Sequence, residues 1–360
     1  MHMLQLRRTK TGLKVAAAGQ AQLAIDRDAD MAEKRAAISR AVKRILSTCE
    51  FIGRSAVVNL PTCEMDIHSI RMPAMPDDEL AKALRFEVQE RFDTDISTTE
   101  IGFVRLGELR QGDELKHEII LMLAPHRITI NYLDALIAAG LRPKAVDASF
   151  NACARCFNRT YRRRSDQNKV RMVLNVCHET TDVLILRGSR IGFYRAVNIG
   201  GRHLDEAVAD HLGLGITEAA ELRRRRMKGD EQADSSIDRA LREATRPLIV
   251  DLAHEAALCQ RYYSVTFRGN VPGEVFLTGQ QAHEPNLQPV VGDELKVRTQ
   301  VGKPLEHVDV SSAFIKADRR SNFAEWAVAV GLCLKGQKGL QSSGNSDVKH
   351  QDAESSRRAA

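Results

Sequence analysis

From Val173 to Leu186 the chain reads Val-Leu-Asn-Val-Cys-His-Glu-Thr-Thr-Asp-Val-Leu-Ile-Leu. Two apolar runs flank a short polar connector, a pattern that predicts two buried strands joined by a tight loop. The backbone N–H groups and threonine hydroxyls of such a loop can turn toward an anion. A glycine pair, Gly200-Gly201, and a helix-like run follow. This order of parts therefore predicts a phosphate-binding loop in an α/β protein.

The overall composition indicates a water-soluble protein of two domains. The chain has 360 residues, 43% of them hydrophobic and 28% charged, which is enough to bury a substantial core. Its 53 Lys and Arg are interleaved with 47 Asp and Glu, so the net charge of +6 does not by itself indicate nucleic acid. Aromatic residues make up only 5%, which argues further against base stacking. We expect no nucleic-acid partner.

Apolar runs in the sequence are short. None approaches the ~20 residues of a transmembrane helix, and the first residues lack the longer apolar stretch of a signal peptide. The sequence therefore predicts a cytoplasmic protein that reaches a membrane only through a partner.

Cysteine spacing does not indicate a metal centre. The chain has seven cysteines, and Cys153 and Cys156 form the only close pair. A zinc site would need a second pair at usable spacing. We expect no metal site here, and we interpret these two thiols as core residues on a helix.

Strand-like and helix-like segments alternate in two blocks of similar size, which predicts two related α/β halves with a ligand cleft between them. The first half is expected at residues 1–160 and the second at 169–335, separated by the polar stretch 159–168. Residues 336–360 are rich in Gln, Ser, Gly, Asp and Arg, and are expected to form a disordered tail. The four consecutive arginines at 223–226 cover every face of a predicted helix, so we interpret them as a solvated surface.

With these elements placed, the chain resembles the PilM family, the actin-like cytoplasmic assembly proteins of type IV pili and related secretion systems. The likeness extends from residue 1 to about residue 335. It rests on eight segments in the order of the family, at residues 57–61, 72–80, 84–92, 139–147, 179–182, 199–201, 275–279 and 326–331. The resemblance implies an α/β, actin-like/Hsp70-type (ribonuclease H-like) two-domain fold. It also implies an extra small subdomain inserted at about residues 75–124.

The resemblance further implies ATP and Mg²⁺ between the two halves. The residues at the family's nucleotide positions are Asn175, Cys177, Glu179, Thr180, Thr181, Gly200, Gly201, Gly279 and Gln280.

Several of these positions depart from the family pattern. Asn175 replaces the Asp expected to hold Mg²⁺ through water, and a neutral amide offers the metal no charge. Cys177 replaces a glycine that lets the backbone approach phosphate. Gln280 stands in the adenosine loop in place of glycine, and Ala220 stands where the family has a ribose-binding Glu. The first strand and first phosphate loop of the family have no counterpart here, and we expect the true start to lie upstream of Met1.

The free energy lost with these nucleotide-binding residues determines the affinity for Mg-ATP that we expect. A buried charge-assisted hydrogen bond costs ~2–4 kcal/mol when it is removed. Losing a clamp loop, a metal carboxylate and two glycines would remove about 10 kcal/mol on that scale. A micromolar ligand binds with only ~8 kcal/mol. We therefore expect a pseudo-ATPase, which does not hydrolyse ATP and binds Mg-ATP weakly or not at all.

The function implied by the resemblance is that of a scaffold without catalytic residues. It would sit at the cytoplasmic face of the inner membrane, in a type IV pilus or type II-like protein secretion platform. Its partners would be the N-terminal peptide of a PilN-like bitopic inner-membrane protein, bound near the extra subdomain, and other platform components.

The alternative is an active actin-like ATPase that switches the platform. Glu179, Thr180 and Thr181 would then contact phosphate, and Gly279 would contact adenosine. A sugar or acetate kinase of the same superfamily is disfavoured because no substrate-loop acid stands out.

Overall fold

The structure is a computed structural model. It describes residues 1–23, 25, 29–92, 94–111, 114–161, 163–227, 235–311 and 322–336. The predicted disordered tail at 336–360 lies outside these residues, apart from Gly336.

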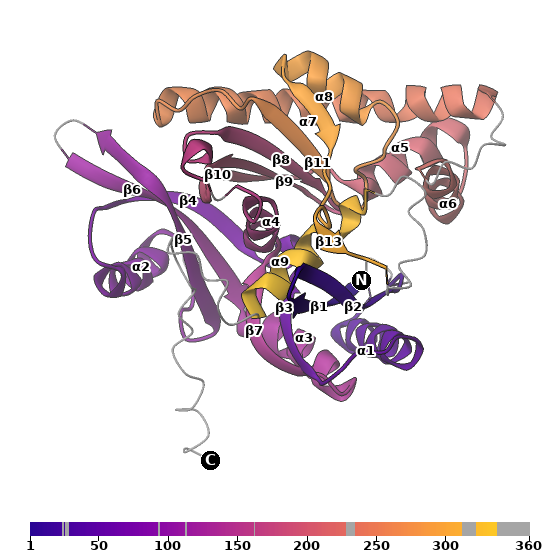
Figure 1. Cartoon of the computed structure of the whole chain (residues 1–360), viewed down its shortest axis with the longest axis horizontal. Helices are drawn as coiled ribbons and strands as arrows, with labels where there is room; N and C mark the ends of the chain where they lie inside the picture. Colours follow the sequence, from indigo (N-terminus) through magenta and orange to yellow (C-terminus); the bar gives the residue numbers. More distant parts are fainter. Residues whose placement is uncertain are drawn as a thin grey trace.

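A five-stranded mixed sheet forms the centre of the second half (Figure 1). Its strand order is β10-β9-β8-β11-β12, with β8 at Val170–Val176, β9 at Thr181–Arg187, β10 at Arg190–Val197, β11 at Glu274–Thr278 and β12 at Arg298–Val301. Strands β8 and β9 pair antiparallel and are joined by a short loop, so the predicted strand–loop–strand unit is confirmed. All seven residues of β8 are buried, because both faces of this sheet are covered.

Helices and a second core enclose that sheet. Helix α7 (Ser235–Thr266) packs its apolar residues Leu252 and Ala256 with Met172 and Leu174 on one face. Residues on the opposite face of this sheet, such as Val173, pack into a second hydrophobic core. Helices α5 (Gly201–Leu212), α6 (Ile216–Met227) and α8 (Leu287–Leu295) complete the second half.

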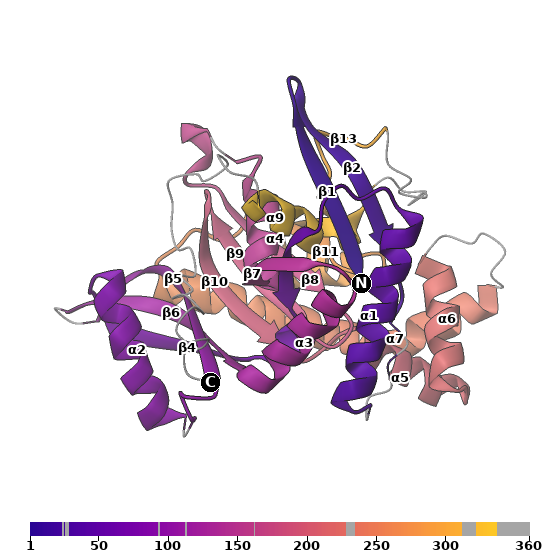
Figure 2. The same ribbon diagram turned by 90° about the horizontal axis from the view of Figure 1, so that it is seen from below.

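The first half contains two small sheets. Strands β1 (His2–Thr9) and β2 (Gly12–Gln20) form an antiparallel hairpin that projects from the body of the molecule (Figure 2). Strands β3 (Ser55–Leu60) and β7 (Arg142–Ala148) form a separate parallel pair. No pairing joins β1 to β3 in the described part of the chain. Instead, the side-chain amide of Gln5 donates to the Ile52 carbonyl at 2.7 Å and accepts from the Ile52 N–H at 3.0 Å.

Four helices cover these strands. Helices α1 (Met31–Thr48) and α3 (His126–Ala138) lie side by side over one apolar cluster (Figure 2). Helices α4 (Ser149–Asn158) and α9 (Ala327–Gly336) pack against each other on the other side.

The last segments that the structure describes return to the first half. The short strand β13 (Val308–Asp309) pairs with β2, and α9 packs on α4, β1 and β3. The thiol of Cys333 in α9 donates to the Leu4 carbonyl of β1 at 3.0 Å. We therefore propose that the second half ends before β13, earlier than the boundary at residue 335 expected from the sequence.

The extra subdomain is an antiparallel sheet covered by one helix. Its strands are ordered β4-β6-β5, with β4 at Asp66–Pro73, β5 at Thr99–Gln111 and β6 at Glu114–Pro125. Helix α2 (Asp77–Arg91) packs on one face through Leu80, Leu84 and Val88. The other face shares a core with Leu184 and Tyr194 of the second half. Because β4 belongs to this sheet, we propose that the subdomain begins nearer residue 66 than the expected residue 75.

Candidate functional site

The predicted phosphate loop connects β8 to β9 and is closed on itself. The Cys177 N–H donates to the Thr180 carbonyl at 3.0 Å. Asn175 is buried, and its Nδ2 donates across the ladder to Asp182 Oδ2 at 3.0 Å. Within the described residues, Asn175 Oδ1 has no hydrogen-bond partner. The Cys177 N–H is therefore already hydrogen-bonded within the loop.

The N-terminus of α5 faces the same loop and is also occupied. The Gly201 N–H donates to the Cys177 carbonyl at 2.9 Å, and the Arg202 N–H donates to the His178 carbonyl at 2.8 Å. First-turn N–H groups are the donors with which a helix binds an anion. Here loop carbonyls already occupy two of them.

Side chains of the loop are bound to the protein as well. Glu179 Oε2 accepts from Arg202 Nε at 2.7 Å. The Thr181 hydroxyl donates to the Ile199 carbonyl at 2.6 Å, and Thr180 is half-buried. Burial raises the pKa of the Cys177 thiol above its usual value, so this thiol stays protonated and is poorly suited to act as a nucleophile.

A buried carboxylate, Asp182, joins the two halves at the base of the loop. Its Oδ1 accepts from the Tyr194 hydroxyl at 3.0 Å and from Thr62 Oγ1 at 3.4 Å. Thr62 belongs to the first half, where its hydroxyl also lies 2.9 Å from Ser149 Oγ. Burial raises the pKa of Asp182 above its usual value, and the hydrogen bonds oppose that shift only in part.

The raised pKa of Asp182 predicts how the stability of the protein changes with pH. The folded state holds the Asp182 proton more tightly than the unfolded state, so stability falls as pH rises from 3.8 through the folded pKa. Asp182→Asn removes this titration. The stability of the wild type minus that of the variant should therefore decrease between about pH 4 and pH 7. Urea denaturation of both proteins at several pH values measures this difference. A difference that stays constant or increases with pH would contradict the assignment.

Gly279 and two glutamines follow β11. Gly279 adopts φ 89°, and a Cβ there would lie 2.5 Å from the Val176 carbonyl oxygen, so this close approach requires glycine. Gln280 is exposed, whereas Gln281 is buried. A Cβ placed on Gly201 would lie 2.4 Å from Gln281 Nε2. The Gln281 side chain therefore fills the space beside the glycine at the start of α5.

Arg223 of α6 occupies the same space beside Gly201 and Gln281. Its side chain is only 2% exposed. It donates to the Gly201 carbonyl at 3.0 Å, to Gln281 Oε1 at 2.9 Å and to Glu284 Oε2 at 2.7 Å. It also forms an ion pair with Asp205 of α5. One guanidinium thus ties α6 to α5 and to the segment after β11.

The interpretation of residues 223–226 as a solvated surface was therefore wrong for Arg223. The other three fit it better, because they are less buried and pair locally. Arg224 and Arg225 form ion pairs with Glu221, and Arg226 pairs with Asp238. A run of four arginines does not show which one faces inward. The packing of α6 against α5 determines that.

The structure brings the predicted site residues together. Asn175, Cys177, Glu179, Thr180 and Thr181 form one loop region, and the α5 N-terminus at Gly200 and Gly201 contacts it. Gly279 also lies close, because a Cβ there would be 2.9 Å from Asn175 Oδ1. Gln280 points to solvent. Sequence reasoning gave Arg223 and Asp182 no role in this region. Asp182 was detectable as the ladder neighbour of Asn175.

Comparison with known proteins identifies the family. The sequence model of the family described as "Type IV pilus assembly protein PilM" matches residues 1–337. The chain belongs to the PilM family. The resemblance inferred from the eight segments is thereby confirmed. A search of curated proteins found no match.

Comparison with solved structures concerns the fold. A structure described as "PilM-PilN type IV pilus biogenesis complex" matches with a TM-score of 0.75 and 22% identity, covering 93% of this chain and 95% of that one. The fold is therefore the actin-like two-domain fold expected from the sequence. The ethanolamine utilization protein EutJ from Carboxydothermus hydrogenoformans also matches, with a TM-score of 0.41, 16% identity and coverage of 58% of this chain and 61% of that one.

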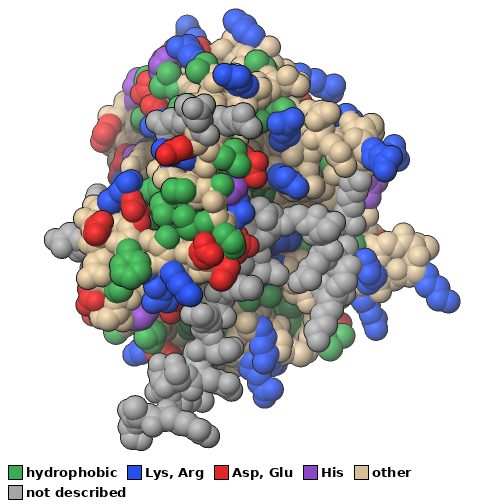
Figure 3. Space-filling model, turned by 90° about the vertical axis from the view of Figure 1, so that its left-hand side faces the viewer, with side chains coloured by type: hydrophobic (Ala, Val, Ile, Leu, Met, Phe, Trp, Pro, Cys, Tyr) green, Lys and Arg blue, Asp and Glu red, His purple; other side chains and the backbone are tan. Residues whose placement is uncertain are grey.

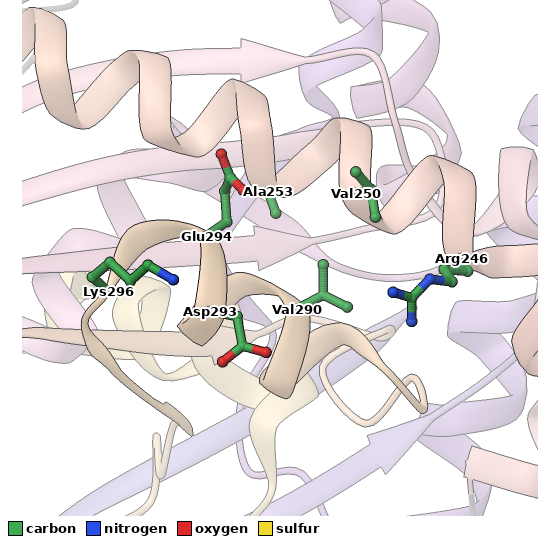
Figure 4. A pocket seen from close by; sticks show the side chains of 7 residues that line it. All are labelled: Arg246, Val250, Ala253, Val290, Asp293, Glu294 and Lys296. Atoms are coloured by element: carbon green, nitrogen blue, oxygen red, sulfur yellow. The ribbon is translucent and has the colours of Figure 1, made fainter.

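Other features of this PilM family chain lie outside the loop region. Among the described residues, no helix is both long enough and apolar enough to span a bilayer. A hollow of about 260 Å³ lies between α7 and α8, and Figure 4 shows the residues that line it. Arg246 and Lys296 line it together with Asp293 and Glu294. These opposite charges do not favour one kind of ligand, and none of the predicted nucleotide residues lines this hollow.

Proposed function

We propose that this chain is a cytoplasmic scaffold of a type IV pilus or type II-like secretion platform. It would bind the N-terminal peptide of a PilN-like bitopic inner-membrane protein and would not use nucleotide. Membership of the PilM family supports the pilus assignment. The similar solved structure is a PilM-PilN complex, which supports a partner of that kind.

The filled nucleotide region is the observation that carries the scaffold proposal. The actin-like fold implies Mg-ATP, but the residues present do not fit it. The resemblance places adenosine near Gly279 and α6, where Arg223 and Gln281 are buried against each other. The loop N–H of Cys177 and the α5 N–H groups already donate to carbonyls. Binding Mg-ATP at the place that the resemblance implies would require breaking these contacts, including the buried ion pairs of Arg223.

The alternative of an active ATPase has one observation in its favour. Asn175 Oδ1 is a buried oxygen without a hydrogen-bond partner among the described residues, so it could accept a bond from a metal-bound water. A single neutral oxygen is weak support, because Mg²⁺ sites use carboxylates and phosphates. The network around Arg223 outweighs it.

The extra subdomain is the proposed place of peptide binding. One face of the molecule, on the side of this subdomain, shows hydrophobic side chains gathered beside acidic and basic ones (Figure 3). Helix α2 of this subdomain carries Phe86, whose side chain is 71% exposed. Exposed aromatic residues are common anchors of peptide binding.

A binding titration tests this proposal. A synthetic N-terminal peptide of the PilN-like partner should bind the full chain, with the same affinity in the presence and absence of Mg-ATP. Phe86→Ser should weaken binding by about 10- to 150-fold, because a buried aromatic side chain contributes roughly 1.5–3 kcal/mol. Val265→Ser is the matched control, since Val265 is 74% exposed on α7. Absence of peptide binding by the wild type would contradict the proposal, as would tightening of the complex by Mg-ATP.

A further inference from the structure

Helix α1 carries an unusual excess of positive charge. Its 18 residues include five cations, Lys34, Arg35, Arg40, Lys43 and Arg44, and a single acid, Glu33. The acid lies in the first turn, where it completes a capping box with Asp30. Beyond that turn, the helix has no negative charge of its own.

The cations gather on the outer face of α1. Ile38, Val42 and Ile45 are buried against the first half. Arg40, Lys43 and Arg44 are all exposed, and their spacing places them on one face of the helix. None of these three forms an ion pair within the described residues. The contrast with α7 is clear, since Arg239 there pairs with Glu243. The outer face of α1 therefore keeps its full charge.

The neighbouring helix α3 also exposes apolar side chains. Ile130 and Ile137 are 56% and 57% exposed and lie two turns apart, with the exposed Asp134 between them on the same face of α3. Asn131 Nδ2 of α3 donates to the Met31 carbonyl of α1 at 3.1 Å. Both helices cover the same apolar cluster and lie at the outside of the molecule (Figure 2). Their outer faces together form what we call the α1–α3 face, defined by Arg40, Lys43, Arg44, Ile130 and Ile137.

We propose that the α1–α3 face binds the surface of an anionic phospholipid bilayer. Arg40, Lys43 and Arg44 would contact headgroup phosphates, and Ile130 and Ile137 would enter the boundary between headgroups and acyl chains. Exposed aliphatic residues beside a row of cations are the composition of interfacial helices. Nucleic acid fits less well, because none of the five residues that define the face offers an aromatic ring for stacking. This proposal goes beyond peptide binding and replaces the expectation that the membrane is reached only through a partner.

Vesicle sedimentation tests the proposal on the full chain without any partner. Wild-type protein should pellet with vesicles of phosphatidylcholine containing about one-third phosphatidylglycerol, and not with phosphatidylcholine alone. About 0.5 M KCl should reduce the bound fraction, because salt screens exposed charges. The variant Arg40→Gln/Lys43→Gln/Arg44→Gln should bind at least about tenfold less, since each cation near an anionic surface strengthens binding severalfold. Ile130→Ser/Ile137→Ser should weaken binding at both salt concentrations.

Matched controls separate this face from general charge. Arg239→Gln/Arg242→Gln/Arg246→Gln removes the same number of exposed cations from α7 and should leave vesicle binding unchanged. Peptide binding measured on the same variants should also be unchanged, which separates this proposal from the proposed function. Equal pelleting with neutral and anionic vesicles would overturn the proposal. So would an equal loss in the α7 variant. Tighter binding of a duplex DNA oligomer than of vesicles, lost in the α1 variant, would assign the face to nucleic acid instead.

Discussion

Arg223→Met should lower the free energy of unfolding by about 3–5 kcal/mol, because it leaves Asp205 and Glu284 buried without their cation. Methionine keeps much of the side-chain volume, so the loss reports the charge and the hydrogen bonds rather than a cavity. Urea denaturation followed by circular dichroism measures it. Because Arg223 also ties α6 to α5, amide hydrogen exchange in both helices should become faster.

Two comparisons make this prediction specific. Arg224→Met, one residue along α6, removes a more exposed ion pair with Glu221 and should change stability by less than about 1 kcal/mol. The variant Arg223→Met/Asp205→Asn/Glu284→Gln removes the uncompensated charges and should recover a large part of the loss. A wild-type-like stability for Arg223→Met would show that this network does not hold the second half together.

Gly331→Ala should be the other strongly destabilising substitution. A Cβ at this position would lie 1.8 Å from the backbone carbonyl oxygen of Ala152, so α9 and α4 would have to separate. Arg155 Nη1 also donates to the Gly331 carbonyl at 2.9 Å, and this contact would be disturbed. Overpacking of this kind costs about 3 kcal/mol, at the upper end of its usual range. Thermal or urea unfolding would measure the loss.

Gly336→Ala provides the control in the same helix. A Cβ there would meet only Val57 Cγ2, at an ordinary 3.5 Å. Alanine has the better helix propensity, so stability should be unchanged or slightly raised. If both variants lost stability equally, the close approach of α9 to α4 would not be the cause.

Much of the fold was predictable from local sequence patterns. The apolar runs on either side of Cys177–Thr180 predicted β8 and β9, and the pairing of these strands confirms that prediction. Apolar residues at helical spacing between residues 238 and 263, such as Leu241, Leu252 and Ala256, are typical of an amphipathic helix, and α7 runs there from Ser235 to Thr266. These elements bury enough apolar surface along their own length to be recognised without their neighbours.

Features that depend on distant segments were not predictable in this way. The strand β13 is only Val308–Asp309, and its pairing with β2 is set by the fold. Strand β4 was missed because its burial comes from β6, about fifty residues later in the chain. The return of α9 to the first half follows from its close packing on α4, which the sequence between them does not reveal.

The candidate site, too, could be predicted only where it depends on local sequence. Asn175 and Cys177 were recognisable as departures from the family pattern, since they occupy known positions of a local loop. Arg223 was not, because its partners Asp205 and Glu284 lie 18 and 61 residues away along the chain. A substitution that removes a ligand is visible in the sequence. A side chain such as Arg223, which occupies the nucleotide region from a distant helix, can be recognised only in the three-dimensional structure.

Calorimetric titration of the full chain with Mg-ATP tests the central claim most directly. We predict no saturable binding heat up to about 1 mM nucleotide, a limit that corresponds to ~4 kcal/mol of binding free energy. Arg223→Met should not by itself create tight binding, because Asn175 and the occupied α5 N–H groups remain. Saturable binding of Mg-ATP by the wild type at micromolar concentration, lost on substitution of Asn175, would contradict the proposal of a nucleotide-free scaffold.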